Sequence, residues 1–413
     1  MILVPNRLQL LSGNNTLCIL CLLVFLSACS PKVVPVKRSE KKAPPAKDKP
    51  RVAEPVKKDM DHSIALLLPF ELNTIKIETA TRKDISKADL AIDFYQGFKL
   101  ALDSLSDNGH NYKLQVFDTQ DQETRVVNLA RANSVRNNDL IVGPVFPDGI
   151  STFTEFSELG TSLLVSPLAA AIPSQFNNPN LVTVNNTIDQ HGWKVADFIT
   201  RNYKPEQVNI ILINTQKTDD EKFSAPIRRY FKELSGSKFF ITERPNSIGL
   251  ETYLSPAKNN LILISSSDRI FLLPTINRLY TLSKGKYKIE VFGHPNWIKT
   301  KFLDVEKMQA LNTRITASYF VNYKARNVKN FVSRYRDEYG FEPSEFAFEG
   351  FDIGYYFGRL LERYGKAYPN HLDDDTYLGL HNNFRFSKDP KVGYLNTELI
   401  ILKYQGFELK PVK

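Results

Sequence analysis

The side chains that could do chemistry are scattered through this sequence of 413 residues. The six histidines form no His-x-x-x-His pair, and neither a Gly-x-Ser-x-Gly elbow nor a Gly-x-x-x-x-Gly-Lys loop is present. Residues 373–375 are three aspartates, which would suit a cation with oxygen ligands but which we interpret as solvated charge. The sequence therefore predicts a protein that is not an enzyme and that needs no metal or cofactor.

Two histidines lie at the expected ends of elements. His191, with Asp189, opens an expected helix, and we interpret it as a hydrogen-bonded histidine of the cap region, with a general base as the alternative. His294 follows an expected strand, where it is either a turn residue or a ligand contact.

A run of serines follows another expected strand. Asp268 is expected to cap the next helix, because its carboxylate can accept a hydrogen bond from a free backbone N–H group. Ser265 and Ser266 at the same helix start leave an anion site as the alternative.

The three cysteines, at positions 18, 21 and 29, lie near the start of the sequence. Residues 17–26 are ten apolar residues in succession. A membrane-spanning helix needs about 20 residues, so this run has the length of a signal-peptide core instead. Residues 26–29, Leu-Ser-Ala-Cys, resemble the lipobox of bacterial lipoproteins. The resemblance implies that residues 1–28 are a signal peptide and that Cys29 is lipidated; an ordinary signal peptide is the alternative.

Residues 29–62 are expected to form a disordered tether after the lipidated cysteine. From residue 30 onward they are rich in Pro and Lys and hold ten Lys or Arg against five Asp or Glu, which is +5 of the total charge of +9. Such a tether reaches at most about 100 Å at about 3.1 Å per residue. We interpret it as a spacer, with attraction to an anionic membrane or cell-wall polymer as the alternative. The remaining chain is nearly balanced in charge, so no nucleic-acid partner is predicted.

Apolar strands alternate with amphipathic helices from residue 63 onward. Strands are expected at 63–68, 112–118, 139–143, 162–165, 181–184, 207–214, 238–242, 260–264 and 288–292. Helices are expected between them, at 90–105, 124–135, 150–159, 189–202, 219–234 and 269–282. This repetition predicts an α/β protein with mostly parallel sheets and two lobes of similar size. Aromatic residues at helical spacing between 346 and 357 are expected to pack between elements, with a sugar platform as the alternative.

Three stretches resemble the type I periplasmic-binding-protein fold, as in the receptors for branched-chain amino acids. They are 66–70 with 94–102, 139–145 with 163–168, and 331–352, which contains Tyr339-Gly340, Pro343 and Gly350-Phe351-Asp352. The resemblance implies two Rossmann-like lobes with parallel-sheet cores, three crossovers and a central cleft. Lobe 1 would be 63–186 plus 317–380, and lobe 2 would be 187–316 plus 381–413.

The resemblance also implies where a ligand would touch the cleft. The positions are Phe70, Ser166, Pro167, Leu168, Asn214, Ser265, Ser266 and His294. Amino-acid receptors of this fold place hydroxyl groups in the loop after Ser-Pro, whereas this chain has alanines at 169–171. Because alanine offers no side-chain donor, we expect a less polar ligand or none.

Together these features predict a lipid-anchored periplasmic solute-binding protein that binds a small ligand and works with a transporter permease. The alternative is an outer-membrane lipoprotein that regulates a cell-wall synthesis enzyme and transports nothing. Ser30 follows Cys29, in place of the aspartate that favours inner-membrane retention in the lipoproteins this chain resembles. We therefore expect attachment to the outer membrane, facing the periplasm.

The lipidation prediction is tested by Cys29→Ser in a bacterial host. Without the thiol the chain should lose both palmitate labelling and its place in the membrane fraction, because acyl chains supply the anchoring free energy. The matched control is Cys21→Ser, which should keep both. Palmitate incorporation into the Cys29→Ser chain would contradict the prediction.

Overall fold

The computed structural model describes residues 62–76, 78–86, 88–107, 109–169, 171–234, 236 and 238–412. The chain divides into two compact units, Met1–Lys58 and Asp59–Lys413, and the described residues belong to the second. The expected signal peptide, Cys29 and the tether up to residue 61 lie outside the described residues. Within the described part, no helix is both long and apolar enough to cross a membrane.

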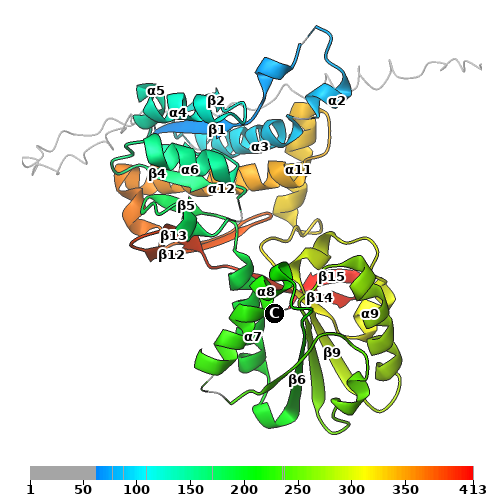
Figure 1. Cartoon of the computed structure of the whole chain (residues 1–413). Helices are drawn as coiled ribbons and strands as arrows, with labels where there is room; N and C mark the ends of the chain where they lie inside the picture. The colour runs from blue at the N-terminus through cyan, green and yellow to red at the C-terminus, as the bar shows by residue number, and fades with distance from the viewer. Residues whose placement is uncertain are drawn as a thin grey trace, which may run out of the picture. The chain divides into compact units, whose positions relative to one another are not determined.

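The first lobe is built on an eight-stranded sheet in the order β11-β12-β13-β5-β4-β3-β1-β2 (Figure 1). Its parallel strands are β1 (His62–Leu68), β2 (Tyr112–Asp118), β3 (Leu140–Val142), β4 (Leu163–Ser166), β5 (Leu181–Thr183) and β13 (Gly393–Asn396). Strands β12 (Asn383–Asp389) and β11 (Thr376–Leu378) are antiparallel to their neighbours.

The second lobe is built on a seven-stranded sheet in the order β15-β14-β10-β9-β8-β6-β7. Its parallel strands are β6 (Val208–Ile213), β7 (Ile241–Arg244), β8 (Asn259–Ile264), β9 (Lys288–Gly293) and β10 (Arg314–Ala317). The antiparallel edge strands are β14 (Ile400–Gln405) and β15 (Glu408–Pro411).

Helices cover both faces of each sheet, which explains continuous apolar runs such as Ile64–Leu68 in the central strands. In β1, Ile64 and Leu66 face a core that includes α3 (Asp89–Ser106) and α12 (Glu345–Tyr364). Ala65 and Leu67 face the opposite core, with α4 (Glu123–Arg131) and α6 (Pro147–Phe156). The second sheet has α7 (Ile188–Asn202) and α8 (Thr218–Arg229) on one face and α9 (Arg269–Ser283) and α10 (Val305–Ala310) on the other. The other α-helices of the described residues are α2 (Arg82–Ile85), α5 (Asn133–Arg136) and α11 (Arg326–Tyr339).

Two glycines bring α3 and α12 into direct backbone contact. A Cβ atom on Gly97 would lie 1.9 Å from the backbone oxygen of Ala347, and one on Gly350 would lie 2.2 Å from that of Phe94. No larger side chain fits at either place without moving a helix. The contact fixes the first turns of α12, which carry Glu345 and Glu349.

The predicted α/β class and the strand–helix alternation are confirmed, with local differences. The short helix α2 and the strand β10 lie outside the helices and strands expected from the sequence. Helix α8 contains Pro226 and ends in a π-helical turn at Tyr230–Leu234. Proline removes one backbone donor, so the α-helical hydrogen bond from residue 226 to residue 222 is absent.

The chain passes between the two sheets three times, as predicted. The first crossing follows β5, the second follows β10, and the third lies between β13 and β14. The strand pairing differs from the division expected at residue 380, because β12 and β13 belong to the first sheet and only β14 and β15 join the second. The reason is apolar burial: Phe384, Phe386 and Tyr394 all pack into the core of the first lobe.

Asn396, at the third crossing, connects that crossing to the first one. Its Nδ2 donates to the backbone oxygens of Val184 and Asn383, at 3.0 Å each. Its Oδ1 accepts from the backbone N–H groups of Arg385 and Glu398, at 3.1 Å each. Only 1% of the surface of Asn396 is exposed. If the amide is removed, water therefore cannot replace it as a partner of these backbone groups.

Asn396→Ala should lower the free energy of unfolding by about 3 kcal/mol, since each buried group left without a partner costs about 1–3 kcal/mol. Urea denaturation measures this difference. The exposed Asn330 of α11 provides the control, because Asn330→Ala should change stability by less than about 0.5 kcal/mol. Equal effects of the two substitutions would show that Asn396 does not hold the crossings.

Candidate functional site

A cavity of about 860 Å³ opens where the crossings meet the loops of both sheets. This interlobe cavity lies within the size range of ligand pockets, about 300–1,000 Å³. Its apolar wall includes Val145, Leu168, Ile172, Ile188, Ile298 and Phe346. Its polar wall includes Asn185, His191, Lys222, Lys299, Ser318, Tyr319, Glu345 and Glu349.

These residues lie where strands end and helices begin, at the carboxyl-terminal edges of the two sheets. Val145 and Leu168 follow the parallel strands β3 and β4, and Ser318 follows β10. His191 lies in the first turn of α7, and Glu345 begins α12. The carboxyl ends of parallel strands and the starts of the following helices are where α/β proteins bind ligands.

An ion pair spans the cavity from one lobe to the other. The Nζ atom of Lys299, in the short helix Pro295–Lys299, lies 3.2 Å from Oε1 of Glu345 on α12. The Lys299 ammonium also lies 5.6 Å from the centre of the Tyr319 ring, and that ring stacks on His381 at 4.2 Å. Burial and the nearby Glu345 carboxylate raise the pKa of the Tyr319 hydroxyl, which keeps it a neutral donor.

Glu349 is the buried acid of the cavity wall. Only 4% of its surface is exposed, and Oε1 has no hydrogen-bond partner among the described residues. Burial raises the pKa of its carboxyl well above the usual value, and the neighbouring Glu345 adds to the effect. Hydrogen bonding from Asn185 and the charge of Lys299 oppose the rise without cancelling it.

His191 connects the first crossing to the second. Its Nδ1 lies 2.8 Å from Oγ1 of Thr316, and its Nε2 lies 3.2 Å from Oγ of Ser318. Burial, with a smaller effect from the charge of His294, lowers its pKa to about 3. It is a hydrogen-bonded neutral histidine, in agreement with the interpretation from the sequence, and the helix itself is capped by Thr187 with Gln190.

Of the eight positions implied for ligand contact, Leu168 lines the interlobe cavity. Ser166 and Pro167 are buried beside it, and Ser166 Oγ has no hydrogen-bond partner among the described residues. Phe70 packs edge-to-face against Tyr95, with ring centres 6.3 Å apart. None of these three residues lines the cavity.

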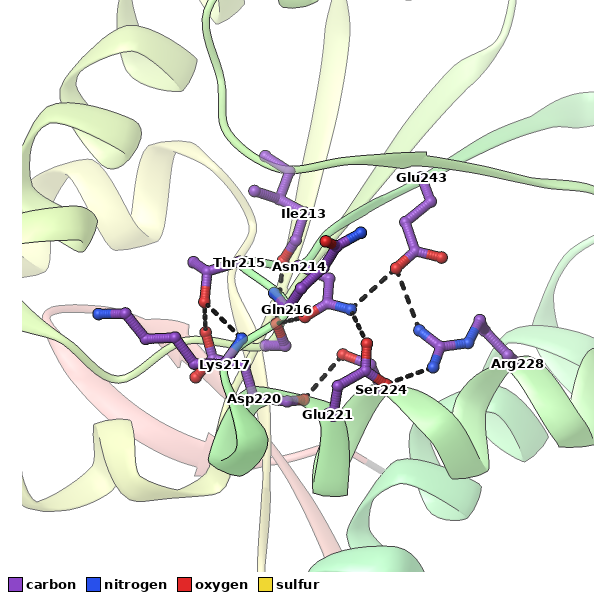
Figure 2. Close-up of polar contacts among 11 residues, drawn as sticks. Ile213, Asn214, Thr215, Gln216, Lys217, Asp220, Glu221, Ser224, Arg228 and Glu243 are labelled. Carbon is purple, nitrogen blue, oxygen red and sulfur yellow. Dashed lines mark hydrogen bonds and ion pairs between the residues drawn. The ribbon is translucent and has the colours of Figure 1, made fainter.

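Asn214 is held in a polar network within the second lobe (Figure 2). Its Nδ2 donates to Oε1 of Glu221 at 2.6 Å and to Oε1 of Glu243 at 2.8 Å. Arg228 pairs with both of these carboxylates, and its hydrogen bonds complete the network. The amide donor expected for a ligand is therefore used inside the lobe.

Ser265 and Ser266 also have partners inside the second lobe. Ser265 Oγ donates to the backbone oxygen of Ile213 at 3.1 Å. The backbone oxygen of Ser266 accepts from Nε1 of Trp297 at 2.9 Å, and its hydroxyl accepts from the N–H of Asp268. Asp268 caps α9, as predicted, with Oδ1 accepting from Ile270 N–H at 2.9 Å.

His294 occupies a turn, which was one of its two expected roles. Its Nδ1 accepts from the N–H of Asn296 at 3.1 Å, and its ring meets Phe223 edge-to-face at 5.1 Å. Burial lowers its pKa to about 4. The residues that follow it, Pro295 and Asn296, line the cavity in its place.

Reasoning from the sequence missed the charged residues of the cavity. Glu345 and Glu349 are four residues apart at the start of a helix, so they share a face, and this spacing was the available signal. The aromatic residues that follow them pack between elements as expected; Phe348, for example, lies 4.7 Å from Phe331. Of the aspartates at 373–375, Asp375 pairs with Arg359 at 3.0 Å. The described residues contain no group of three acids or histidines placed to hold a metal.

Similarity to known proteins is found at the level of structure. No family model matches the sequence, and no curated protein matches it in sequence. A structure from Rhodospirillum rubrum described as a branched-chain amino acid ABC transporter is 15% identical, with a TM-score of 0.60, over 86% of this chain and 100% of that one. A periplasmic ligand-binding protein of a branched-chain amino acid ABC transporter from Burkholderia xenovorans is 14% identical, with a TM-score of 0.54, over 86% and 95% of the two chains.

A third structure, an ABC transporter substrate-binding protein from Desulfitobacterium hafniense, is 12% identical, with a TM-score of 0.53, over 86% of this chain and 100% of that one. At these identities the similarity concerns the fold alone. This chain has the type I periplasmic-binding-protein fold that its sequence predicted.

Stability should fall on acidification, because His191, His294 and His381 have folded-state pKa values of about 3, 4 and 4, lowered mainly by burial. Between pH 6.5 and 4 the unfolded chain binds protons at these sites while the folded chain does not, so the stability present above pH 6.5 is lost. His191→Gln removes one of the three sites. We expect the variant to lose about 3 kcal/mol less than the parent between pH 7 and 4, since one pKa unit corresponds to about 1.4 kcal/mol. Chemical denaturation measures the stability of both chains at each pH. Equal losses of stability in the parent and in His191→Gln between pH 7 and 4 would contradict the prediction.

Proposed function

We propose that this chain is a non-catalytic solute-binding protein that holds a small ligand in the interlobe cavity. The observation that supports this most directly is the position of the cavity. It lies at the carboxyl ends of parallel strands from both sheets and is lined by residues before and after the crossings. A ligand there touches both lobes at once.

Such a ligand would act on the segments that connect the lobes. Ser318 and Tyr319 belong to the second crossing, and Asn185 and Asn186 belong to the first. A ligand that contacts both crossings stabilises the arrangement of the crossings in which it makes the most contacts. This is the coupling that a binding protein needs in order to present a loaded form to a partner.

Lipidation of Cys29 is the second part of the proposed function. With Cys29 lipidated and residues 1–28 removed, the binding unit faces the periplasm from the outer membrane, as its sequence predicts. Its partner would be a transporter permease that takes up the released ligand.

The regulatory alternative has its own support. Ala169 and Ala171 contribute no polar side chain to the cavity, and Asn214, Ser265 and His294 use their polar atoms internally. A protein whose cavity stays empty would act through its surface, on a cell-wall synthesis enzyme. Crosslinking in cells distinguishes the two, since it should recover permease subunits for a solute-binding protein and cell-wall enzymes for a regulator.

The proposed function is tested by a thermal-shift screen of the Cys29→Ser chain against amino acids, amines, peptides, nucleosides and aromatic acids. A bound ligand at 100 times its dissociation constant should add about 2.7 kcal/mol of stability.

Leu168→Trp should abolish the shift by filling the cavity, whereas Leu72→Trp, at a position 56% exposed, should keep it. No shift with any compound, or an undiminished shift in Leu168→Trp, would overturn the proposal.

A further inference from the structure

The charged side chains that line the interlobe cavity are not all paired with an opposite charge. Lys299 pairs with Glu345 at 3.2 Å, and Lys222 pairs with Asp219 at 2.9 Å. Glu349 is the acid of the lining that takes part in no ion pair of the described residues. The cavity wall thus contains a buried carboxyl that no cation of the described residues pairs with.

The surroundings of Glu349 make this imbalance costly when the carboxyl is ionised. Glu345 and Asp352 face it from its own helix, Lys299 faces it from the helix Pro295–Lys299, and Tyr319 faces it from the second crossing. Two of these neighbours are acids and one is a cation already paired with Glu345. A cation brought by a ligand would pair with Glu349 out of contact with water, where a charge-assisted hydrogen bond is strong.

The rest of the cavity limits what else the ligand carries. Both lysines have acid partners, and Leu168, Ala169 and Ala171 offer no side-chain donor where a carboxylate would need one. A ligand carboxylate would therefore lie near Glu345 and Glu349 without a free cation. The apolar wall instead suits a hydrocarbon body.

We propose that the interlobe cavity binds small organic amines that lack a carboxylate, with the ammonium group on Oε1 of Glu349 and the hydrocarbon body against the apolar wall. This inference rests on the proposed function and names its ligand class. Binding balances as a proton exchange: neutral Glu349 gives its proton to the solvent, and the resulting carboxylate pairs with the ligand ammonium.

Isothermal titration calorimetry on the Cys29→Ser chain tests the inference with three matched sets. Each set contains an amine, its alcohol and its amino acid: 3-methylbutylamine, 3-methylbutanol and leucine; phenethylamine, phenethyl alcohol and phenylalanine; butylamine, butanol and norvaline. We expect one or more amines to bind at least about tenfold more tightly than their partners, because the alcohol lacks the cation and the amino acid adds a carboxylate that finds no free cation in the cavity. Titration in buffers of different ionisation enthalpy should show proton release.

Glu349→Gln keeps the shape of the side chain but cannot ionise to a carboxylate. It should weaken amine binding at least about tenfold and reduce the proton release, because the ion pair is lost. The control is Glu338→Gln at an exposed position of α11, which should bind as the parent does. Circular dichroism and thermal unfolding establish that each variant is folded, and Glu349→Asp serves as a second variant that keeps the charge.

The outcomes separate the inference from the proposed function. Tighter binding of alcohols or amino acids than of amines, or equal amine affinity in Glu349→Gln and the parent, overturns the amine inference and leaves a ligand-binding protein. A screen in which no compound of any class shifts the unfolding temperature overturns the proposed function, and the inference with it.

Discussion

The structure depends on a small set of buried polar side chains that fix the three crossings. We call Asn396, His191 and Asp352 the crossing clasp. Asn396 joins the first and third crossings, and His191 joins the first and second. The carboxylate of Asp352 accepts backbone N–H groups of Leu380, His381 and Asn382, at 2.8 Å each, and the N–H of Phe320 in the second crossing donates to His381. Because these groups are buried, water cannot replace a partner that is lost.

The crossing clasp also determines the chemistry of the cavity. It positions Ser318 and Tyr319 on one side, while the glycine contacts between α3 and α12 position Glu345 and Glu349 on the other. Glu349 lies one helical turn before Asp352, so the cavity has a second carboxyl behind it. The carboxylate of Asp352 accepts hydrogen bonds from the backbone, whereas Oε1 of Glu349 has no hydrogen-bond partner among the described residues. That difference separates a structural acid from one that is available to a ligand.

Much of the fold followed from the sequence because its causes are local. Apolar runs such as Ile64–Leu68 require cover on both faces, and this predicts parallel sheets between helices. The site was less accessible because its contacts join residues far apart in the chain. Asn214 and Ser265 lie at strand ends as expected, but Glu221 and Glu243 bind the amide of Asn214, and the hydroxyl of Ser265 donates to Oδ1 of Asn214. Likewise, β13 belongs to the first sheet because of its pairing with β5, which no local pattern encodes.

The proposed ligand site is the cavity between the two sheets, where a small ligand would contact residues of both lobes. It is tested most directly by a crystal structure of the chain grown with the compound that gives the largest thermal shift. We expect ligand density in the cavity, in contact with Glu349 of α12 and with residues of the second lobe such as Ile298. Density for the compound at another surface, with the cavity closed by side chains, would contradict it.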